Sequence, residues 1–235
     1  LVSRLRQRLG LTVSVKDIFS YRNIERLFDN VIKQSLANDS NNTEIIISTE
    51  QGQLTGEMTL LPIQQWFFEN QFTTPHHWNQ SFIIKTPQLD LERLQISLDR
   101  LILHHDAFRL RYKKTQHSPR TYIQYYDINA GSTKIRTLDV RTLKSKEGSQ
   151  SFTNTIDEIL TTWQSNFNLE LGPLYNVGYL YGYKNGTSVI HFALHHLIVD
   201  SVSWRILAED LESIYHGKDL GQKGSSYRQW VATVE

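Results

Sequence analysis

The stretch His195–Trp204, HHLIVDSVSW, combines residue types that can transfer protons. Its two histidines end a predicted strand, Asp200 follows soon after, and a helix is expected to begin near Val202. Since successive side chains of a strand point to opposite faces, His195 and His196 should face opposite ways. Imidazole accepts and donates protons near neutral pH, and a nearby carboxylate can orient it or can pair with an arginine instead. The stretch is therefore a candidate for acid–base catalysis, with a structural, hydrogen-bonded histidine pair as the alternative.

Two serines in the same stretch suggest a second kind of chemistry. Ser201 and Ser203 lie close to His196 in the sequence, as a serine nucleophile and its base could. The chain has no GxSxG segment, the tight turn that exposes such a serine in many hydrolases. Both serines are instead expected to cap the helix that follows.

Three pairs of adjacent histidines raise the question of a metal site; they are His76-His77, His104-His105 and His195-His196. Neighbouring histidines rarely direct both rings at one ion, and the HExxH spacing of zinc hydrolases is absent. Because the sequence contains no cysteine, thiolate zinc sites and disulfides are excluded. We therefore expect no metal.

The elements that must position these residues fall into three segments. Residues 1–36 have helical periodicity, with Ile24 and Leu27 on one predicted helix face. Residues 37–56 are rich in Asn, Ser, Thr, Gly and Gln and are predicted to be a linker. Residues 57–235 mix helix and strand patterns and carry all the candidate residues.

Within this third segment, helices are expected over 62–68, 89–103, 152–163 and 202–215, and strands over 81–85, 107–112, 122–126, 134–139, 174–181 and 188–194. The last two strands flank Lys184-Asn185-Gly186 and predict a hairpin. This order favours an α+β sandwich over a regular βαβ fold. Asp106 and Arg109, near the start of one strand, are predicted to form a local ion pair or to lie on a solvated strand edge.

The bulk properties exclude several function classes. The 235 residues carry a formal net charge of +1 and no basic run with interleaved aromatics, so nothing indicates nucleic-acid binding. No apolar run approaches the roughly 20 residues that span a bilayer, and no signal peptide is visible. We expect a cytoplasmic protein without membrane attachment. Because helical periodicity begins at the first residues, we also expect both ends to be cut from a longer polypeptide.

Three segments together resemble the condensation-domain superfamily of nonribosomal peptide synthetases. HHLIVDSVSWRIL (195–207) resembles its HHxxxDG signature, and VSWRIL is similar to the epimerization branch. LLPIQQWFF (60–68) resembles the PIQxWF segment of epimerization domains, and HHDAFRLRY (104–112) resembles their counterpart of the RHExLR segment. The resemblance covers residues 54–235 and implies a chloramphenicol-acetyltransferase-like sandwich lobe, the N-terminal one of two. Residues 1–36 are similar to the last three helices of a peptidyl carrier domain.

The resemblance implies L-to-D epimerization at Cα of an aminoacyl or peptidyl thioester on a carrier domain. It implies that His196 is catalytic, with His195, Asp200, Trp204 and Arg109 in supporting roles. Asp200 is expected to pair with an arginine, for which Arg109 is the candidate, and Trp204 is expected to pack its helix on the sheet.

The same resemblance implies the cofactor and the partners. The cofactor is 4'-phosphopantetheine on the upstream carrier domain, whose attachment serine is not in this chain. The expected partners are that carrier with its thioester-bound substrate, the second lobe of the same domain and the adjacent synthetase domains. The second lobe would supply a catalytic glutamate from an EGHGRE-like segment.

One departure from the family pattern bears on the site. Ser201 stands where the signature usually has glycine, and serine fits there if its backbone angles are ordinary. Three other functions stay open: a condensation domain in which the same histidine assists amide formation, a dual condensation/epimerization domain, and a non-catalytic module that docks the carrier. A free-standing acetyltransferase is the alternative outside the family, and the carrier-like N-terminus argues against it.

Overall fold

The computed structural model describes residues 13–34, 49–115 and 118–234. The chain divides into two units, residues 1–47 and 48–235. The first 12 residues of the predicted helical segment and most of the predicted linker lie outside the described residues. The division falls inside the predicted linker, and Leu54 is already buried in the core of the second unit.

The described part of the first unit is helical, as expected. Helix α2 (Val15–Tyr21) begins with a capping box, in which Ser14 and Asp17 each accept a hydrogen bond from the other's backbone N–H. Helix α3 (Ile24–Leu27) continues into a π-helical turn, η1 (Phe28–Ile32). The small core of this unit comprises Val13 and Leu27, with Ile18, Tyr21, Val31 and Ile32 packed against them.

The second unit contains a four-stranded sheet of order β2-β7-β6-β5. Its strands are β2 (Asn79–Pro87), β5 (Arg136–Asp139), β6 (Tyr175–Tyr181) and β7 (Thr187–His195). Strands β6 and β7 form the predicted antiparallel hairpin, and β5 pairs parallel with β6. Strand β2 pairs antiparallel with β7 in one unbroken register, from Asn79 opposite His195 to Pro87 opposite Thr187.

A smaller sheet has the order β1-β4-β3 and is antiparallel throughout. Its strands are β1 (Gly56–Met58), β3 (Leu110–Thr115) and β4 (Ser118–Tyr126). A 3-10 turn, η3 (Asp106–Arg109), precedes β3, so the strand expected over 107–112 begins later than predicted. Strand β1 was not predicted, because three residues are too few to show an alternating pattern.

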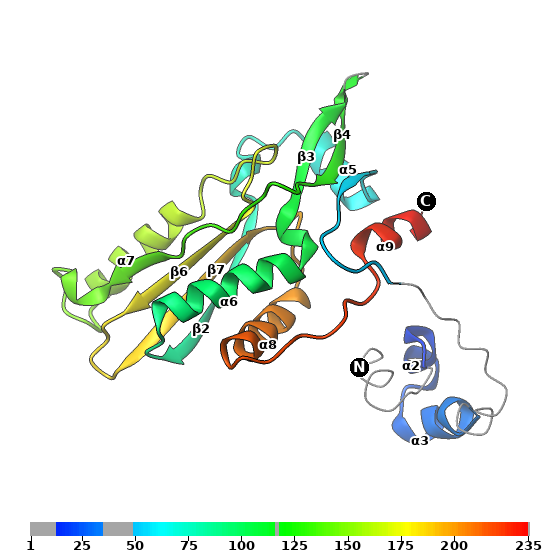
Figure 1. The fold of residues 1–235 in the computed structure, drawn as a ribbon, viewed down its shortest axis with the longest axis horizontal. Helices are drawn as coiled ribbons and strands as arrows, with labels where there is room; N and C mark the ends of the chain where they lie inside the picture. Colours follow the sequence, from blue (N-terminus) through cyan, green and yellow to red (C-terminus); the bar gives the residue numbers. More distant parts are fainter. Residues whose placement is uncertain (1–12, 35–48, 116–117, 235) are drawn as a thin grey trace. The chain divides into compact units, whose positions relative to one another are not determined.

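Helices cover both faces of the larger sheet (Figure 1). Along β7, Ile190, Phe192 and Leu194 point to the face of α6 (Leu91–His104) and α8 (Ser203–Tyr215). Val189, the residue before Ile190, faces α7 (Gln150–Trp163) on the opposite side. On that side Trp163 lies so close to Gly178 of β6 that an added Cβ would come within 2.3 Å of the ring. The β7 strand is therefore buried on both faces, and its end is held in a fixed position.

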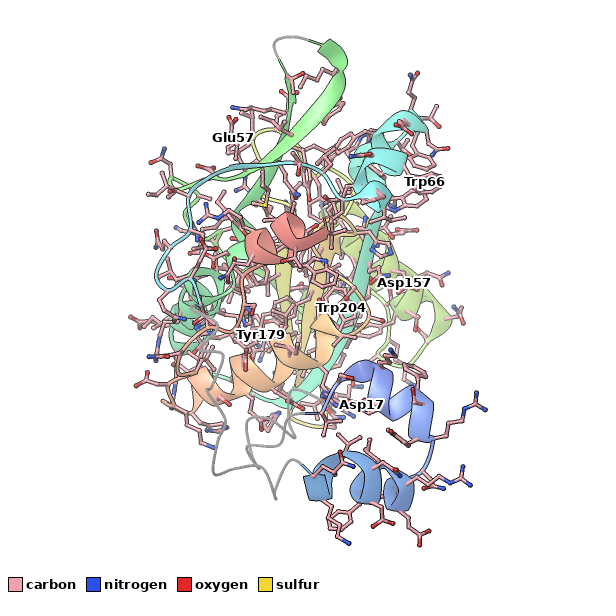
Figure 2. All side chains as sticks on the ribbon, turned by 90° about the vertical axis from the view of Figure 1, so that its right-hand side faces the viewer. Asp17, Glu57, Trp66, Asp157, Tyr179 and Trp204 are labelled. Carbon is pink, nitrogen blue, oxygen red and sulfur yellow. The ribbon has the colours of Figure 1, made fainter. Side chains whose placement is uncertain are left out.

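The remaining elements are two short helices, α5 (Pro62–Glu69) and α9 (Tyr227–Val234), and two further 3-10 turns, η2 (Pro75–His77) and η4 (Val140–Thr142). Helix α5 begins at Pro62, directs Gln64 and Phe67 inward and leaves Trp66 47% exposed on its outer side (Figure 2). The arrangement is the predicted α+β sandwich. Over the described ranges, the structure contains no helix of the length and apolar character that crossing a bilayer requires.

Candidate functional site

His195 is completely buried at the end of β7 and is held as a neutral imidazole. Its Nδ1 accepts a hydrogen bond from the Leu197 N–H at 3.2 Å, so the proton lies on Nε2, which donates to the Pro75 carbonyl at 2.8 Å. The ring of Phe67 packs edge-on at 5.6 Å. Burial lowers the pKa of His195 to about 4. The residue therefore anchors the chain that follows β7.

His196 faces the other way, as strand alternation predicts, and its side chain is exposed. Its backbone N–H donates to the Trp78 carbonyl at 2.9 Å, which extends the β2–β7 ladder by one hydrogen bond. The imidazole Nδ1 lies 3.1 Å from the Val199 carbonyl oxygen, and Nε2 lies 3.1 Å from Nε2 of Gln80. The ring is thus held at both nitrogens and still reaches solvent, which suits a group that exchanges protons with a bound substrate.

Trp204 of α8 contacts two residues of β2, Phe82 and Gln80, the second of which lies beside His196. Its ring packs against Phe82 of β2 with the centroids 4.6 Å apart, so the helix lies on the sheet as predicted (Figure 2 labels Trp204). Its indole N–H also donates to Gln80 Oε1 at 3.2 Å. The sequence assigns Gln80 no role, and its place beside His196 follows from the β2–β7 register.

A buried polar network joins the three segments that carried the family resemblance. Gln64 of α5 donates from Nε2 to the Tyr112 hydroxyl at 3.1 Å and to Gln124 Oε1 at 3.0 Å. The Tyr112 hydroxyl in turn donates to the Leu197 carbonyl at 2.9 Å. Burial raises the pKa of Tyr112 well above its usual value, so the hydroxyl keeps its proton. Residues from 60–68 and 104–112 therefore fix the backbone next to His196.

Asp200 caps the start of α8 and does not pair with an arginine, which corrects our expectation. Its Oδ1 accepts from the backbone N–H groups of Val202 and Ser203 at 3.1 and 2.9 Å, and from the Ser203 hydroxyl at 2.6 Å. The Ser203 hydroxyl bond is the main reason that the pKa of Asp200 is lowered. Because that hydroxyl is committed to Asp200, the structure does not support Ser203 as a nucleophile for His196.

Ser201, in the position usually held by glycine, needs no special backbone conformation. Within the described ranges, only Arg22 and Gln71 among non-glycine residues have a positive φ. Glycine is required only where φ is positive or space is short, and Ser201 is exposed. The serine is therefore compatible with this loop.

Arg109 lies elsewhere, buried at 1% exposure, so the prediction that it pairs with Asp200 is wrong. It forms an ion pair with Asp106 on the same 3-10 turn and donates to the Leu54 carbonyl at 3.1 Å. Asp106 also pairs with Lys223 Nζ at 2.7 Å. The local ion pair expected between Asp106 and Arg109 is confirmed, and the alternative of a solvated strand edge is wrong because both side chains are largely buried.

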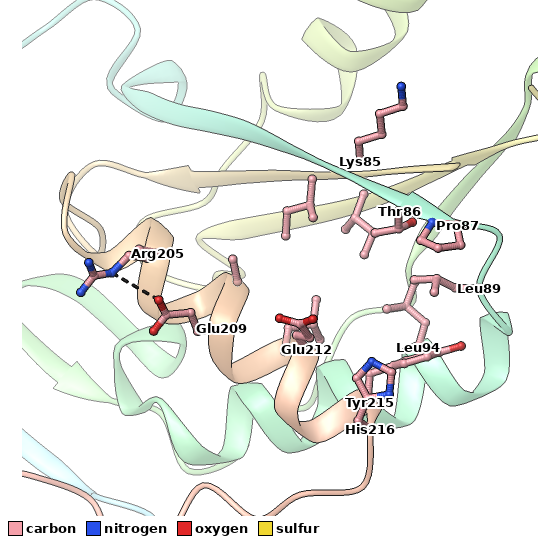
Figure 3. A pocket seen from close by; sticks show the side chains of 14 residues that line it. Lys85, Thr86, Pro87, Leu89, Leu94, Arg205, Glu209, Glu212, Tyr215 and His216 are labelled. Carbon is pink, nitrogen blue, oxygen red and sulfur yellow. Dashed lines mark ion pairs between the residues drawn. The ribbon is translucent and has the colours of Figure 1, made fainter. Parts of the chain in front are cut away.

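A groove of about 330 Å³ lies between β2 and α8, away from the 195–200 loop (Figure 3). Its floor is apolar, with Ile84, Leu94 and Ile190, and the ion pair between Arg205 and Glu209 lies at its rim. None of the residues that surround His196 lines it. The candidate site is therefore defined by the contacts of His196 and not by this groove.

The described residues contain no group of three His, Cys, Asp or Glu side chains placed to hold a metal ion. The first and third histidine pairs lie near each other, since His195 Nε2 donates to the carbonyl of Pro75, the residue before His76. His76 and His77 lie in η2, His195 ends β7 and His196 follows it, and His105 Nε2 donates to the Asp210 carboxylate of α8 at 2.8 Å.

Comparisons with known proteins agree with the arrangement of the three segments. The sequence model of the Condensation domain family matches residues 54–235. N-(5-amino-5-carboxypentanoyl)-L-cysteinyl-D-valine synthase of Amycolatopsis lactamdurans is 43% identical over 100% of this chain, and tyrocidine synthase 2 of Brevibacillus parabrevis is 35% identical over 96%. The chain spans about 6% of the length of each of these synthetases.

Two solved structures show the same fold. The epimerization domain from the third module of tyrocidine synthetase B is 34% identical with a TM-score of 0.67, and the match covers 80% of this chain and 41% of that one. The starter condensation domain of rhizomide synthetase is 16% identical with a TM-score of 0.62, covering 76% and 43%. The chain therefore belongs to the condensation-domain superfamily of nonribosomal peptide synthetases.

Proposed function

We propose that this chain contributes His196 to the L-to-D epimerization of an aminoacyl or peptidyl group held as a thioester on a carrier domain. The observation that carries the proposal is the 34% identity to a solved epimerization domain over 80% of this chain, against 16% for a condensation domain of similar fold. The 43% identical relative is named for a product that contains D-valine, which supports the same direction.

In the proposed reaction the thioester acidifies the hydrogen at Cα. Nε2 of His196 takes this proton, and the electrons of the broken C–H bond move into the enolate of the substrate. A proton then returns to Cα from the opposite face, which inverts the configuration. We place the second proton-transfer group in the part of the domain that this chain does not match, since the chain covers only 41% of the solved epimerization domain.

The partners in this proposal are a carrier domain and the remainder of the synthetase. The thioester is carried by 4'-phosphopantetheine on that carrier, and residues 1–36 are proposed to be the carrier's last helices. Phosphopantetheine supplies the reactive thioester linkage and a flexible arm. The residues of this chain position the imidazole that meets the substrate.

The test uses a synthetase that contains this chain with the change His196→Ala. After the carrier is loaded with the L-aminoacyl group, the thioester is hydrolysed and the L and D forms are separated by chiral chromatography. We expect the D form to fall to background. The matched control is His216→Ala, an exposed histidine at the end of α8, which should leave the ratio unchanged. Full epimerization by the His196 variant would exclude the proposal.

Amide-bond formation is the second candidate, since the matched family model is that of the Condensation domain. In that reaction His196 would take a proton from the attacking amine of an acceptor substrate. An acceptor carrier loaded with an aminoacyl group distinguishes the two functions. Transfer of the donor group to the acceptor by the wild-type protein, lost in His196→Ala, would favour condensation or a dual function.

A further inference from the structure

We propose that Gln80 is a positioning residue that holds His196 in its neutral Nδ1–H form, and that Trp204 fixes the orientation of the Gln80 amide. The inference rests on the proposed function for the role of His196, but the proton positions follow from the structure alone. Three contacts run in series: Val199 carbonyl to His196 Nδ1 at 3.1 Å, His196 Nε2 to Gln80 Nε2 at 3.1 Å, and Gln80 Oε1 to Trp204 Nε1 at 3.2 Å.

The two ends of this series each have only one possible role. A backbone carbonyl only accepts hydrogen bonds and an indole N–H only donates. His196 Nδ1 must therefore carry a hydrogen to bond the Val199 carbonyl. Trp204 must face the amide oxygen of Gln80, which leaves the amide NH₂ facing His196. The His196 Nε2 that meets this donor must then present its lone pair.

The other forms of His196 break contacts in this series. In the Nε2–H tautomer, the Nδ1 lone pair would face the Val199 carbonyl, and Gln80 would have to turn its NH₂ toward the Trp204 N–H. Two of the three hydrogen bonds would be lost. The imidazolium form keeps the bond to Val199 but still requires Gln80 to turn, so it loses the bond to Trp204. The series therefore favours a neutral ring with its lone pair on Nε2.

This preference suits a group that takes a proton and gives it back. A neutral Nε2 can accept the Cα proton when the substrate displaces the Gln80 amide from it. Gln80 and Trp204 then disfavour the imidazolium, so the proton does not stay on His196. The other titratable groups on the surrounding elements are His76 and His77 in η2, His195 on β7, Asp200 in the loop, and Arg205 with Glu209 on α8. Of these, His195 is held neutral by its buried contacts, Asp200 bonds the Ser203 hydroxyl, and Arg205 pairs with Glu209.

The test is ¹⁵N NMR of the full chain labelled at histidine, with the His196 signals assigned by their loss in His196→Ala. The wild type should show a protonated Nδ1 and an unprotonated Nε2. In Gln80→Glu, one carboxylate oxygen can still accept from Trp204 while the other faces Nε2, so the imidazolium becomes favourable. We expect the protonation midpoint of His196 to rise by about 1 pH unit or more. Epimerization at neutral pH should fall about threefold or more, because a smaller fraction of His196 then has a free Nε2 lone pair.

Two further variants separate positioning from general effects on folding. Trp204→Phe keeps the ring against Phe82 but removes the N–H, so the Gln80 amide can turn and the ¹⁵N signals should report a mixture of tautomers. Gln150→Glu, an exposed change at the start of α7, should alter neither the His196 signals nor the activity.

An Nε2–H tautomer in the wild type would overturn the proposal, as would an unchanged His196 midpoint in Gln80→Glu. The NMR result does not depend on any reaction. If the expected tautomer is found and His196→Ala still epimerizes, the proposed function fails while the inference about Gln80 stands. If His196 is required but the tautomer is the other one, the reverse holds.

Discussion

Removal of the Tyr112 hydroxyl should destabilise the second unit by about 2 kcal/mol, because it leaves a buried carbonyl without a donor. Tyr112 is 0% exposed, and its hydroxyl donates to the Leu197 carbonyl at 2.9 Å and accepts from Gln64 at 3.1 Å. In Tyr112→Phe, Gln64 keeps its bond to Gln124, whereas the Leu197 carbonyl loses the donor that the Tyr112 hydroxyl supplied. For a domain of this size, 2 kcal/mol corresponds to a decrease of roughly 4–8 °C in Tm.

The measurement is urea unfolding at neutral pH, followed by fluorescence and circular dichroism. Tyr125→Phe is the matched control, because its hydroxyl also donates to a backbone carbonyl, that of Glu170 at 3.1 Å, but at an exposed position. Water replaces that donor, so the expected loss is about 0.5 kcal/mol. Equal losses in the two variants would refute the argument that burial makes the Tyr112 bond important. Tyr112→Phe should also speed amide exchange near Leu197 without changing exchange in α7.

Three further predictions follow from the other ionisable groups. Asp106→Ala should lower the free energy of urea unfolding by about 3 kcal/mol, because it leaves the buried guanidinium of Arg109 unpaired. Glu57→Ala breaks only an exposed ion pair with Lys113 and should lower it by less than about 0.5 kcal/mol, so similar losses in the two variants would contradict the argument. Asp200→Ala should cost about 1 kcal/mol and Asp200→Asn less, since the amide oxygen can still cap α8; thermal melts that rank them in the opposite order would exclude the capping role. Burial lowers the pKa values of His191 and His195 to about 4, so below about pH 6.5 the unfolded chain binds protons that the folded chain does not. The free energy of unfolding should therefore be full above pH 6.5 and fall by up to about 3 kcal/mol per histidine toward pH 4, and a flat profile of urea-unfolding free energies between pH 6.5 and 4.5 would contradict this.

The sequence was informative where a residue's role depends on its immediate neighbours. Strand alternation predicted that His195 and His196 face opposite ways, and turn residues located the β6–β7 hairpin. The ion pair between Asp106 and Arg109 was within reach for the same reason, since the two residues share one turn.

Contacts between segments that are far apart in sequence were not predictable in this way. Gln80 meets His196 only because β2 pairs with β7 in one particular register, and no local pattern fixes that register. The expected pairing of Asp200 with Arg109 failed because each found a nearer partner: Asp200 bonds the N–H groups of its own loop, and Arg109 bonds Asp106. Short polar side chains near a helix start commonly satisfy the backbone first.

The unbroken pairing of β2 with β7 limits how the length of this chain can vary among related proteins. One residue added within β7 would exchange the two histidines between the buried and the open face, unless a bulge absorbed it. The turn between β6 and β7 lies at the far end of the ladder and is exposed around Gly186, so it can lengthen or shorten freely. We therefore expect insertions and deletions among relatives to gather in that turn, and the spacing from Thr187 to His196 to stay constant.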